Sequence, residues 1–202
     1  MIAPIAQILR RSATQLRAAL DALGPLAAPL KQLADSLMRS WKSGGKALIA
    51  GNGGSAADAM HFAEELVVRF AANRRALGAI ALCDPTVLTC AANDLGYDRV
   101  FERQVEALGR PGDVLIVLST SGNSPNLLRA VAAGRKRRLK TAAFLGKGGG
   151  KLRGRCDIEL IVNSDHTARI QEIHKLLFHS LCEWVDGQAQ TSEGKGQGRR
   201  GR

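Results

Sequence analysis

Apolar positions along the chain change their spacing several times, and these changes predict where helices and strands lie. Near the N-terminus, Ile5, Leu9, Leu16 and Leu20 fall on one face of a helix. Further along, short continuous apolar runs such as 113–118 alternate with longer helical patterns. Continuous apolar runs are typical of strands that are buried on both faces. The pattern therefore predicts an α/β fold with a parallel sheet covered by helices on both sides.

Two helices are expected first, and strands and helices then alternate. The expected helices are 2–22, 25–43, 56–70, 98–108, 126–138 and 167–185, with a short helical segment at 85–93. The expected strands are 47–50, 79–83, 113–118, 140–145 and 157–162. No repeat or domain boundary interrupts this order, so residues 1–187 are predicted to form one domain. Residues 188–202 are rich in Gly, Gln and Ser and carry several basic residues, which predicts a disordered basic tail.

A glycine-rich turn at 51–55, Gly-Asn-Gly-Gly-Ser, joins a predicted strand to a predicted helix. Such a turn presents backbone N–H groups and the positive end of a helix dipole, which suits a phosphate or another anion. The turn also partly fits the dinucleotide-binding pattern. However, the acidic residue expected about twenty residues later is missing, and Arg74 and Arg75 lie nearby instead. A nicotinamide cofactor is therefore not expected.

A second polar turn follows the strand 113–118 and carries the hydroxyl groups of Ser119, Thr120, Ser121 and Ser124. Ser124 is a natural N-cap, and Pro125 is a natural first residue of the next helix. In parallel sheets, ligands bind outside the carboxyl ends of the strands, where both turns should lie. The hydroxyls could simply be turn and cap residues. Beside the first turn, a neutral phosphate cradle is the favoured interpretation.

His61 and Glu65 are four residues apart, so they share one face of the helix that follows the glycine turn. The alternative is an exposed polar pair on a helix surface. The last helix carries another polar set, which consists of Gln171, Glu172, His174 and His179. Helical geometry alone would pair Glu172 with His179 and would not single out Gln171.

The composition narrows the classes of function. With 202 residues and 45% hydrophobic residues, the chain can build one α/β domain with a full core. The net charge is +11, but part of it lies in the tail, and no motif that reads RNA or DNA is present. A solvated basic surface is therefore expected rather than a specific nucleic-acid interface.

The cysteines and the N-terminal residues indicate the cellular compartment in which the protein is expected. Four cysteines are widely spaced without a C-x-x-C pair, and we interpret them as small core residues in a reducing, cytoplasmic compartment. No apolar run is long enough to span a membrane. Arg10, Arg11 and Arg17, with no preceding acid, faintly resemble a transit peptide. The amphipathic pattern there favours a structural helix instead.

Several separated blocks of the sequence resemble phosphoheptose isomerases of the sugar isomerase (SIS) family. The blocks are 51–59, 61–63, 65–66, 92–94, 104–108, 119–125 and 168–174. They follow one another in the right order, and the match runs from about the second helix to Val185. The resemblance implies a three-layer α/β/α sandwich of the SIS type, which is flavodoxin-like, with a central parallel sheet and N-terminal helices.

The resemblance also implies an activity. Such an enzyme is an intramolecular oxidoreductase that converts sedoheptulose 7-phosphate to D-glycero-D-manno-heptose 7-phosphate through an enediol. This is the first step of ADP-heptose or GDP-heptose synthesis, which supplies lipopolysaccharide core or other glycans. The family is typically a homotetramer with active sites at subunit interfaces, and some members bind zinc. The implied zinc ligands are His61, Glu65, Gln171 and His179. The implied substrate contacts are Asn52, Gly53, Gly54, Ser55, Glu65, Asn93, Asp94, Ser119, Thr120, Ser121, Ser124 and Gln171.

The chemistry of an aldose–ketose shift needs a base and a second acid–base group. As a hypothesis, Glu65 takes the carbon-bound proton and His179 serves the hydroxyl and carbonyl oxygens. Zinc, one ion per subunit, would polarise the carbonyl. Because an amide such as that of Gln171 is a weak zinc ligand, metal binding could be facultative.

Departures from the family pattern occur at Met60, Glu64 and His166 and in the basic tail, but none affects the implied catalytic set. The main rival function is a non-catalytic SIS protein that binds the bacterial replication initiator. In that paralogue, the position matching His179 is not histidine, whereas this chain retains both Glu65 and His179. A second rival is an isomerase or sensor of another phosphosugar. A sensor would usually carry a DNA-binding domain, for which the chain has no room.

Overall fold

The computed structural model describes the backbone of residues 2–197 and the side chains of residues 4–188. The helices are α1 (Ile2–Asp21), α2 (Ala27–Lys42), α3 (Gly54–Val67), α4 (Pro85–Leu95), α5 (Val100–Leu108), α6 (Pro125–Lys136) and α7 (Thr167–Gln197). The strands are β1 (Ala47–Gly51), β2 (Ala79–Ala81), β3 (Val114–Ser119), β4 (Lys140–Leu145) and β5 (Ile158–Ile161). Three short 3₁₀ helices are η1 (Gly24–Leu26), η2 (Tyr97–Arg99) and η3 (Lys147–Leu152).

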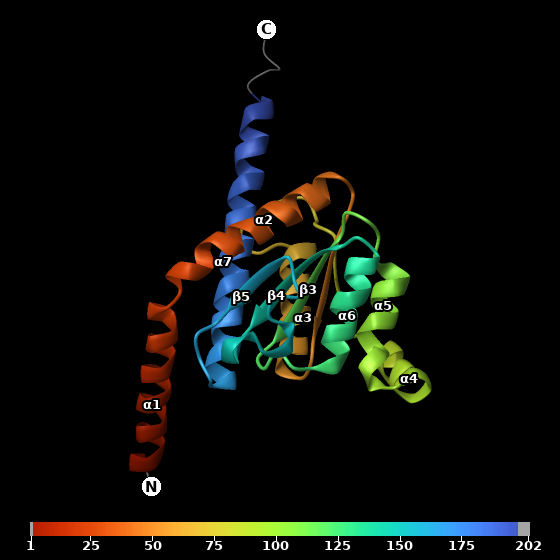
Figure 1. Ribbon diagram of the computed structural model, residues 1–202. Coiled ribbons are helices and arrows are strands. Elements are labelled where there is room, and N and C mark those ends of the chain that lie inside the picture. Colours follow the sequence, from red (N-terminus) through yellow and green to blue (C-terminus); the bar gives the residue numbers. More distant parts are fainter. Residues whose placement is uncertain (1, 198–202) are drawn as a thin grey trace.

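The strands form one parallel sheet in the order β2-β1-β3-β4-β5, as Figure 1 shows in part. After β1 the chain crosses to β2 on one side, whereas β3 pairs with β1 on the other side. This reversal of direction places a topological switch point at the carboxyl ends of β1 and β3. The predicted fold class, a flavodoxin-like α/β/α sandwich with N-terminal helices, is confirmed.

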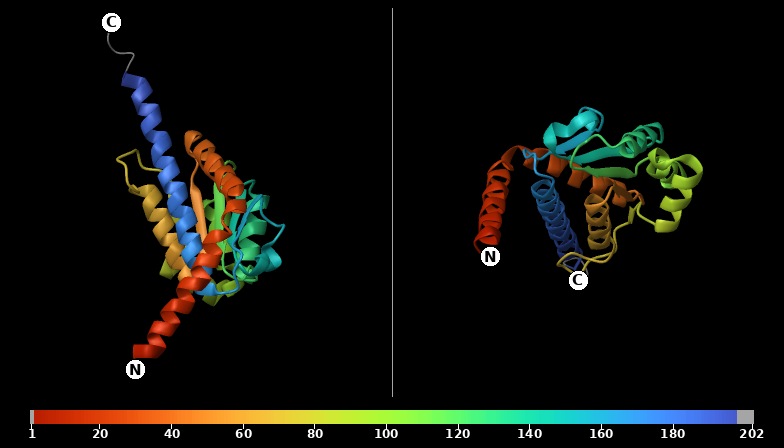
Figure 2. Two further views of the ribbon diagram at one scale, coloured as in Figure 1. Left: turned by 90° about the vertical axis from the view of Figure 1, so that its left-hand side faces the viewer. Right: turned by 90° about the horizontal axis from the view of Figure 1, so that it is seen from below.

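Successive residues of each central strand enter two different cores. In β1, Ile49 belongs to the core that also contains residues of α1, α2, α3 and α7, whereas Leu48 and Ala50 belong to the core under α4, α5 and α6. Figure 2 shows these helices on opposite sides of the sheet. All five residues of β1 are buried, as the continuous apolar run predicted.

Several element ends differ from the prediction, and α3 is the one that matters for the site. It begins at Gly54 and ends at Val67, whereas the sequence predicted 56–70. The early start follows from the glycine turn, whose Gly53 serves as N-cap. The early end follows from Arg74, whose guanidinium hydrogen-bonds the carbonyl oxygens of Glu65 and Leu66. Those carbonyls therefore have partners outside the helix.

The last helix, α7, is longer than predicted and continues past Val185 to Gln197. No proline interrupts the segment between Val185 and Gln197. The expected disordered tail at 188–202 therefore does not match the helical backbone up to Gln197. Residues 198–202 lie outside the described residues.

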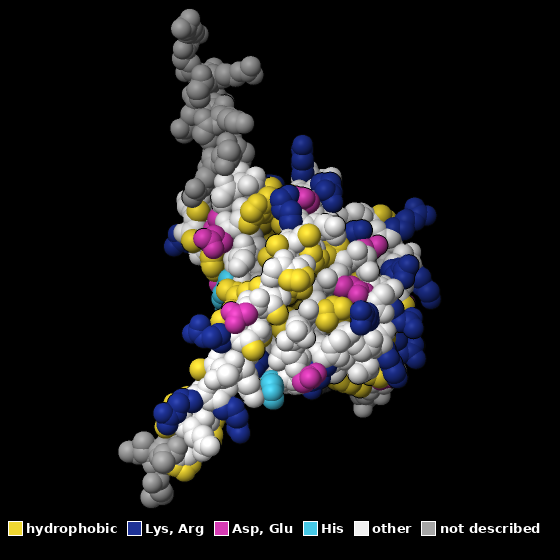
Figure 3. Space-filling view, turned by 60° about the vertical axis from the view of Figure 1, so that its left-hand side comes forward, with side chains coloured by type: hydrophobic (Ala, Val, Ile, Leu, Met, Phe, Trp, Pro, Cys, Tyr) yellow, Lys and Arg dark blue, Asp and Glu magenta, His cyan; other side chains and the backbone are white. Residues whose placement is uncertain are grey.

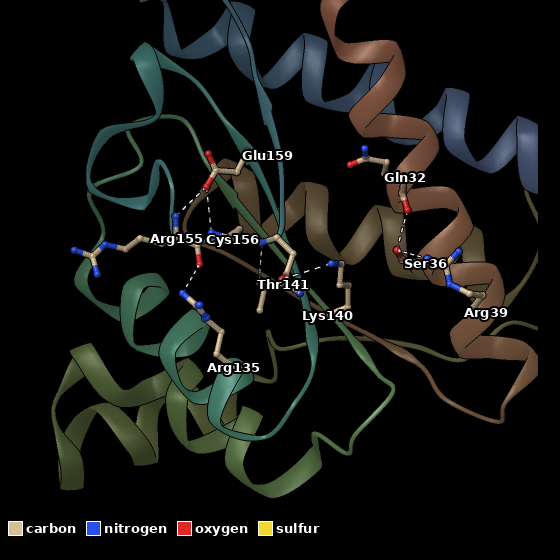
Figure 4. Close-up of polar contacts among 10 residues, drawn as sticks. Gln32, Ser36, Arg39, Arg135, Lys140, Thr141, Arg155, Cys156 and Glu159 are labelled. Carbon is tan, nitrogen blue, oxygen red and sulfur yellow. Dashed lines mark hydrogen bonds and ion pairs between the residues drawn. The ribbon is translucent and has the colours of Figure 1, made fainter.

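The connection into β5 and the middle of α2 are held by local polar contacts (Figure 4). Oε1 of Glu159 accepts hydrogen bonds from the backbone N–H groups of Arg155 at 3.0 Å and Cys156 at 3.1 Å. On α2, the Ser36 hydroxyl donates to the Gln32 carbonyl oxygen at 2.8 Å. The Glu159 contacts lie at the edge strand β5, and both sets lie away from the switch point.

The predicted N-terminal helix is present, but several of its apolar side chains are exposed. Helix α1 extends away from the body in Figures 1 and 2 and exposes Ile5, Ile8, Leu9 and Leu20. Figure 3 shows further hydrophobic side chains on the body of this face, with Lys and Arg along its margin. Among the described residues, no helix has the length and apolar content needed to cross a bilayer.

The cysteines are not all core residues, which corrects the prediction. Cys182 is buried, Cys83 and Cys156 are half-buried, and Cys90 is exposed. Cys90 is exposed because it lines an open cavity between α4 and α5, where its thiol donates to a carboxylate oxygen of Asp94 at 3.5 Å. All four thiols are free.

Candidate active site

The glycine turn forms the first wall of the site. Gly53 has φ 55° and ψ −122°, a left-handed conformation that favours glycine. This conformation ends β1 and starts α3 at Gly54, with the Ser55 N–H donating to the Asn52 carbonyl oxygen at 3.0 Å. The N-terminus of α3 consequently points out at the carboxyl edge of the sheet, where it can receive an anion.

The hydroxyl-rich turn after β3 forms the second wall. The Ser119 hydroxyl oxygen accepts from the Gly122 N–H at 3.0 Å, and the Ser121 hydroxyl oxygen accepts from the Asn123 N–H at 3.3 Å. Ser124 is the N-cap of α6 and Pro125 its first residue, as predicted, but the Ser124 side chain forms no capping bond. Its hydroxyl therefore remains available to a ligand.

A reciprocal pair of amide hydrogen bonds joins the two turns. Asn52 Nδ2 donates to Asn126 Oδ1 at 3.1 Å, and Asn126 Nδ2 donates to Asn52 Oδ1 at 2.9 Å. The Tyr97 hydroxyl donates to the same Asn52 oxygen at 3.0 Å. Since Asn126 is 2% exposed and Asn52 is half-buried, this pair is partly shielded from water and links the two turns.

Three potential metal ligands converge where α3 packs on α7. His61 Nε2 lies 3.1 Å from Glu65 Oε1 and 3.5 Å from His179 Nε2. All three ligand atoms lie within 4.8 Å of one another. The two helices run side by side on one face of the sheet (Figure 2), so residues separated by more than a hundred positions meet here.

The donor set fits zinc. Two ligand atoms that share a tetrahedral zinc at about 2.0–2.1 Å lie about 3.3 Å apart. The two separations from His61, 3.1 and 3.5 Å, are close to that value. Imidazole nitrogen and carboxylate oxygen are common zinc ligands. With all three ligand atoms within 4.8 Å of one another, His61, Glu65 and His179 could therefore hold a zinc ion.

The surroundings of the cluster favour a neutral imidazole on His179. Burial, followed by the neighbouring His61, lowers the pKa of His179. A neutral imidazole has a lone pair for a metal or a proton. One turn before His61, burial raises the pKa of the Asp58 carboxyl, whose Oδ1 lies 3.6 Å from Lys175 Nζ.

Gln171 lies apart from the other three predicted ligands. Its carboxamide is packed against Gly54, where a Cβ would lie 2.5 Å from Gln171 Nε2. Among the described residues, no hydrogen bond joins Gln171 to the cluster. The structure therefore brings Gln171 to the mouth of the anion cradle and brings His61, Glu65 and His179 together further along the same two helices.

The cluster and the cradle are separated along α3. Gly54 and His61 are seven residues apart, which corresponds to about 10 Å along a helix axis. Both lie on the side of α3 that faces α7, because Gln171 contacts the first and His179 the second. An extended ligand could thus place an anionic end in the cradle and its other end beside the cluster.

Within the described part of the chain, no hydrogen bond joins Asn93 or Asp94 to the two turns. They are exposed near the end of α4, where Asn93 Nδ2 donates to Asp94 Oδ1 at 2.8 Å. Asp94 lines a cavity of about 600 Å³ between α4 and α5, with Cys90 and Arg103. In the connection after α4, Tyr97 reaches the glycine turn through its bond to Asn52.

Some residues of the site were missed in the sequence. Asn126 could have been noticed because it follows the cap Ser124-Pro125, but nothing in the sequence pairs it with Asn52. His174, which belongs to the polar set of the last helix in the sequence, is fully buried, and its Nε2 lies 3.3 Å from the Leu145 carbonyl oxygen. It supports the core and does not face the cluster.

A parallel α/β domain with two anion-accepting turns at its switch point defines a class of domain that binds anionic small molecules. A family model described as the SIS domain matches residues 11–146. The chain is 52% identical over 162 residues to the phosphoheptose isomerase of Paramagnetospirillum magneticum, covering 80% of this chain and 84% of the relative. It is 47% identical over 186 residues to that of Aromatoleum aromaticum, covering 90% and 94%. The chain belongs to the SIS domain family.

Solved structures lead to the same family. The structure of phosphoheptose isomerase from Neisseria gonorrhoeae superposes with a TM-score of 0.82 and 41% identity, covering 91% of this chain and 97% of that one. The structure of a phosphoheptose isomerase from Francisella tularensis gives a TM-score of 0.86 and 36% identity, covering 91% and 98%. The resemblance found in the sequence is thereby confirmed, and the relatives support the role of a phosphosugar isomerase.

Proposed function

We propose that this protein is a sedoheptulose 7-phosphate isomerase, which forms D-glycero-D-manno-heptose 7-phosphate for nucleotide-activated heptose synthesis. The observation that carries the proposal is the convergence of His61, Glu65 and His179 beside an anion cradle. The names of the relatives supply the substrate class. An intramolecular oxidoreductase needs no external redox partner, which suits a site built from acid–base groups.

The spacing of the site suits a long phosphosugar. The cradle and the His61 nitrogen are about two helical turns apart, or about 10 Å along α3. In a heptose 7-phosphate, the phosphate is at one end of the carbon chain and the reacting carbons are at the other. The phosphate would bind at the two turns, through Gly53, Gly54, Ser55 and the hydroxyls of Ser119, Thr120, Ser121 and Ser124. Asn52 and Gln171 would contact the sugar.

Glu65 is proposed as the base that removes the C1 proton of the ketose and returns it to C2. Its side chain is 15% exposed and is held by the contact with His61, so its position is defined before substrate arrives. His179 transfers the hydroxyl proton from O1 to O2, so that the sum of the steps moves two hydrogens within one molecule. The lowered pKa of His179 favours the neutral form that can accept a proton at neutral pH.

Zinc is proposed as the cofactor, one ion per subunit, held by His61, Glu65 and His179 with Gln171 as a fourth ligand. When bound, zinc would stabilise the negative charge that develops on the substrate oxygens. Because Gln171 would have to turn from Gly54 to join the set, and because an amide is a weak ligand, the ion could be exchanged readily.

Asn93 and Asp94 are also proposed substrate contacts, and their position outside the cradle suggests how they act. In a homotetramer with interfacial active sites, α4 of one subunit could complete the cradle of its neighbour. The exposed apolar residues of α1 are further surface that such an assembly could cover. Location in the cytoplasm is proposed with the same pathway.

The test is purified protein incubated with sedoheptulose 7-phosphate, with and without a chelator, while heptose 7-phosphate is measured. Turnover that stops on chelation and recovers with zinc is the expected result. Turnover that is insensitive to chelation would remove zinc from the proposal. A folded protein that binds the phosphosugar without turnover would favour the non-catalytic binding function instead.

A further inference from the structure

Arg74 and Asp186 form a buried ion pair at the C-terminal end of α3. Arg74 Nε donates to Asp186 Oδ1 at 2.6 Å, and the two side chains are 1% and 5% exposed. Burying two charges is costly unless both are paired and hydrogen-bonded. This pair meets that condition, because both side chains also form hydrogen bonds to backbone atoms at the end of α3 or in the segment after it.

The Arg74 guanidinium contacts the backbone of one proposed metal ligand, Glu65. Its Nη2 donates to the Glu65 carbonyl oxygen at 2.7 Å, and its Nη1 donates to the Leu66 carbonyl oxygen at 2.9 Å. These carbonyls belong to the last turn of α3 and have no partner within the helix. The guanidinium therefore fixes the backbone from which the Glu65 side chain projects.

Asp186 ties the same assembly to α7. Its Oδ2 accepts from the backbone N–H groups of Ala71 at 2.9 Å and Ala72 at 2.8 Å. Asp186 follows His179 by seven residues, which is about two turns, so both project from the same side of α7. The carboxylate thus connects the helix that carries His179 to the segment that caps the helix carrying His61 and Glu65.

We propose that Arg74 and Asp186 are positioning residues for the metal cluster, setting the distance between α3 and α7 and so the separation of the ligand atoms. This proposal rests on the proposed metal site. Ligand atoms 3.1 and 3.5 Å apart suit a zinc ion, and a shift of one helix by about 1 Å would break that match. The contact of Gln171 with Gly54 holds the opposite end of the helix pair.

The chain contains a matched control for the effect of losing a buried carboxylate. Asp113 accepts backbone hydrogen bonds from Lys46 and Arg110, each at 2.9 Å, and pairs with Lys46 Nζ at 2.6 Å. Like Asp186, it therefore binds two backbone N–H groups and one cation. It lies at the start of β3, at the edge of the sheet opposite to the switch point.

The experiment compares Asp186→Asn with Asp113→Asn by titrating each metal-free protein with Co²⁺ and recording the visible absorption spectrum. Both variants should lower the melting temperature. Only Asp186→Asn should weaken Co²⁺ binding, by about tenfold, and change the band positions of the bound ion. In turnover, kcat should fall while KM stays near the wild-type value, because the cradle lies at the other end of the helices.

Arg74→Lys is the second variant, for use if Asp186→Asn does not fold. It keeps the cation but loses the forked bonds to Glu65 and Leu66, and it should give the same spectral change.

Wild-type Co²⁺ affinity and spectrum in Asp186→Asn or Arg74→Lys would overturn the proposal. Equal weakening in Asp113→Asn would also overturn it, because the effect would then be general destabilisation. A wild-type protein that binds Co²⁺ but does not isomerise the heptose phosphate would defeat the proposed function and leave this inference intact. A wild-type protein that binds no Co²⁺ would overturn both the metal site and the inference.

Discussion

Gly122, in the hydroxyl-rich turn after β3, is packed directly against Gly149 of the η3 loop, and the two backbones leave no room for a side chain between them. A Cβ on Gly122 would collide with the carbonyl oxygen of Gly149. The same contact is reinforced by the Leu152 N–H, which donates to the Gly122 carbonyl oxygen at 2.9 Å. The η3 loop therefore acts as a brace for one wall of the proposed phosphate cradle.

Gly122→Ala should consequently be strongly destabilising. Its φ of 65° is unfavourable for alanine, and the collision involves a backbone atom that cannot turn aside. Gly148→Ala is the matched control, because its φ is 72° but nothing lies within 4 Å of its Cβ position. We expect Gly148→Ala to cost about 1 kcal/mol and Gly122→Ala about 2 kcal/mol more in urea unfolding. Equal losses would show that the loop does not brace the turn.

The link between Asn52 and Asn126 predicts an effect on substrate affinity. Asn126→Leu removes both amide bonds but keeps a side chain of similar size, so Asn52 retains only its bond from Tyr97. The glycine turn would then lose its fixed orientation, and KM for the phosphosugar should rise about tenfold with a smaller change in kcat. Steady-state kinetics measures the split.

Tyr97→Phe serves as the milder comparison for that variant. It removes one bond to Asn52 from a side chain that is 57% exposed, where water can replace the lost partner. A change in KM of about twofold or less is expected. If Tyr97→Phe had the larger effect, the buried amide pair would not be what orients the turn.

The proposed base, Glu65, can be tested against its exposed neighbour on the same helix, Glu64. Glu65→Gln keeps the shape of the side chain but removes its basicity, so kcat should fall by about 10²–10⁴-fold. Glu64 is exposed on the same helix, and Glu64→Gln should leave kcat unchanged. Turnover of both variants with sedoheptulose 7-phosphate gives the comparison. Full activity of Glu65→Gln would remove this residue from its proposed role.

The order of helices and strands could be predicted from the sequence, because the strands are short, mostly apolar runs bounded by polar turns. The strand 140–145 was predicted with the bounds that β4 has. The two turns could also be placed, since parallel strands bring their carboxyl ends to one edge. The pairing of His61 with His179 could not be derived from spacing, because it depends on how α3 and α7 pack. Spacing along the last helix favoured Glu172 as the partner of His179. Only the family resemblance supplied the pairing with His61.

Other features depend on contacts that a sequence pattern does not contain. The end of α3 is set by Arg74 from outside the helix, and no helix propensity marks Val67 as its last residue. Asn93 and Asp94 were implied as substrate contacts by the resemblance, yet in the single chain they lie on α4, outside the cradle. Under the proposed function, their role would depend on an assembly of subunits, which neither local patterns nor one chain can define.

His174 predicts how stability depends on pH. The ring is fully buried, its Nε2 faces the Leu145 carbonyl oxygen at 3.3 Å, and burial lowers the pKa of His174 to about 4. In the unfolded chain the pKa is 6.5. Between these values the unfolded state binds more protons than the folded state, so the free energy of unfolding decreases as the pH falls from 6.5 towards 4. The loss from this group alone is about 3 kcal/mol.

Urea unfolding at a series of pH values measures that loss. Burial lowers the pKa of His179 as well, so it contributes in the same direction. The lowered pKa values of Asp84, Asp157 and Asp186 act mainly around and below pH 3.8, at the lower end of this window, and reduce stability in the same direction. The raised pKa of Asp58 acts in the opposite direction just above pH 3.8, because there the folded state binds that proton more tightly than the unfolded state. His174→Gln keeps a donor for the Leu145 carbonyl oxygen but does not titrate, so most of the slope between pH 6.5 and 4 should disappear. His166→Gln, at an exposed position, should keep the wild-type slope. An undiminished slope in His174→Gln would mean that another group carries the pH dependence.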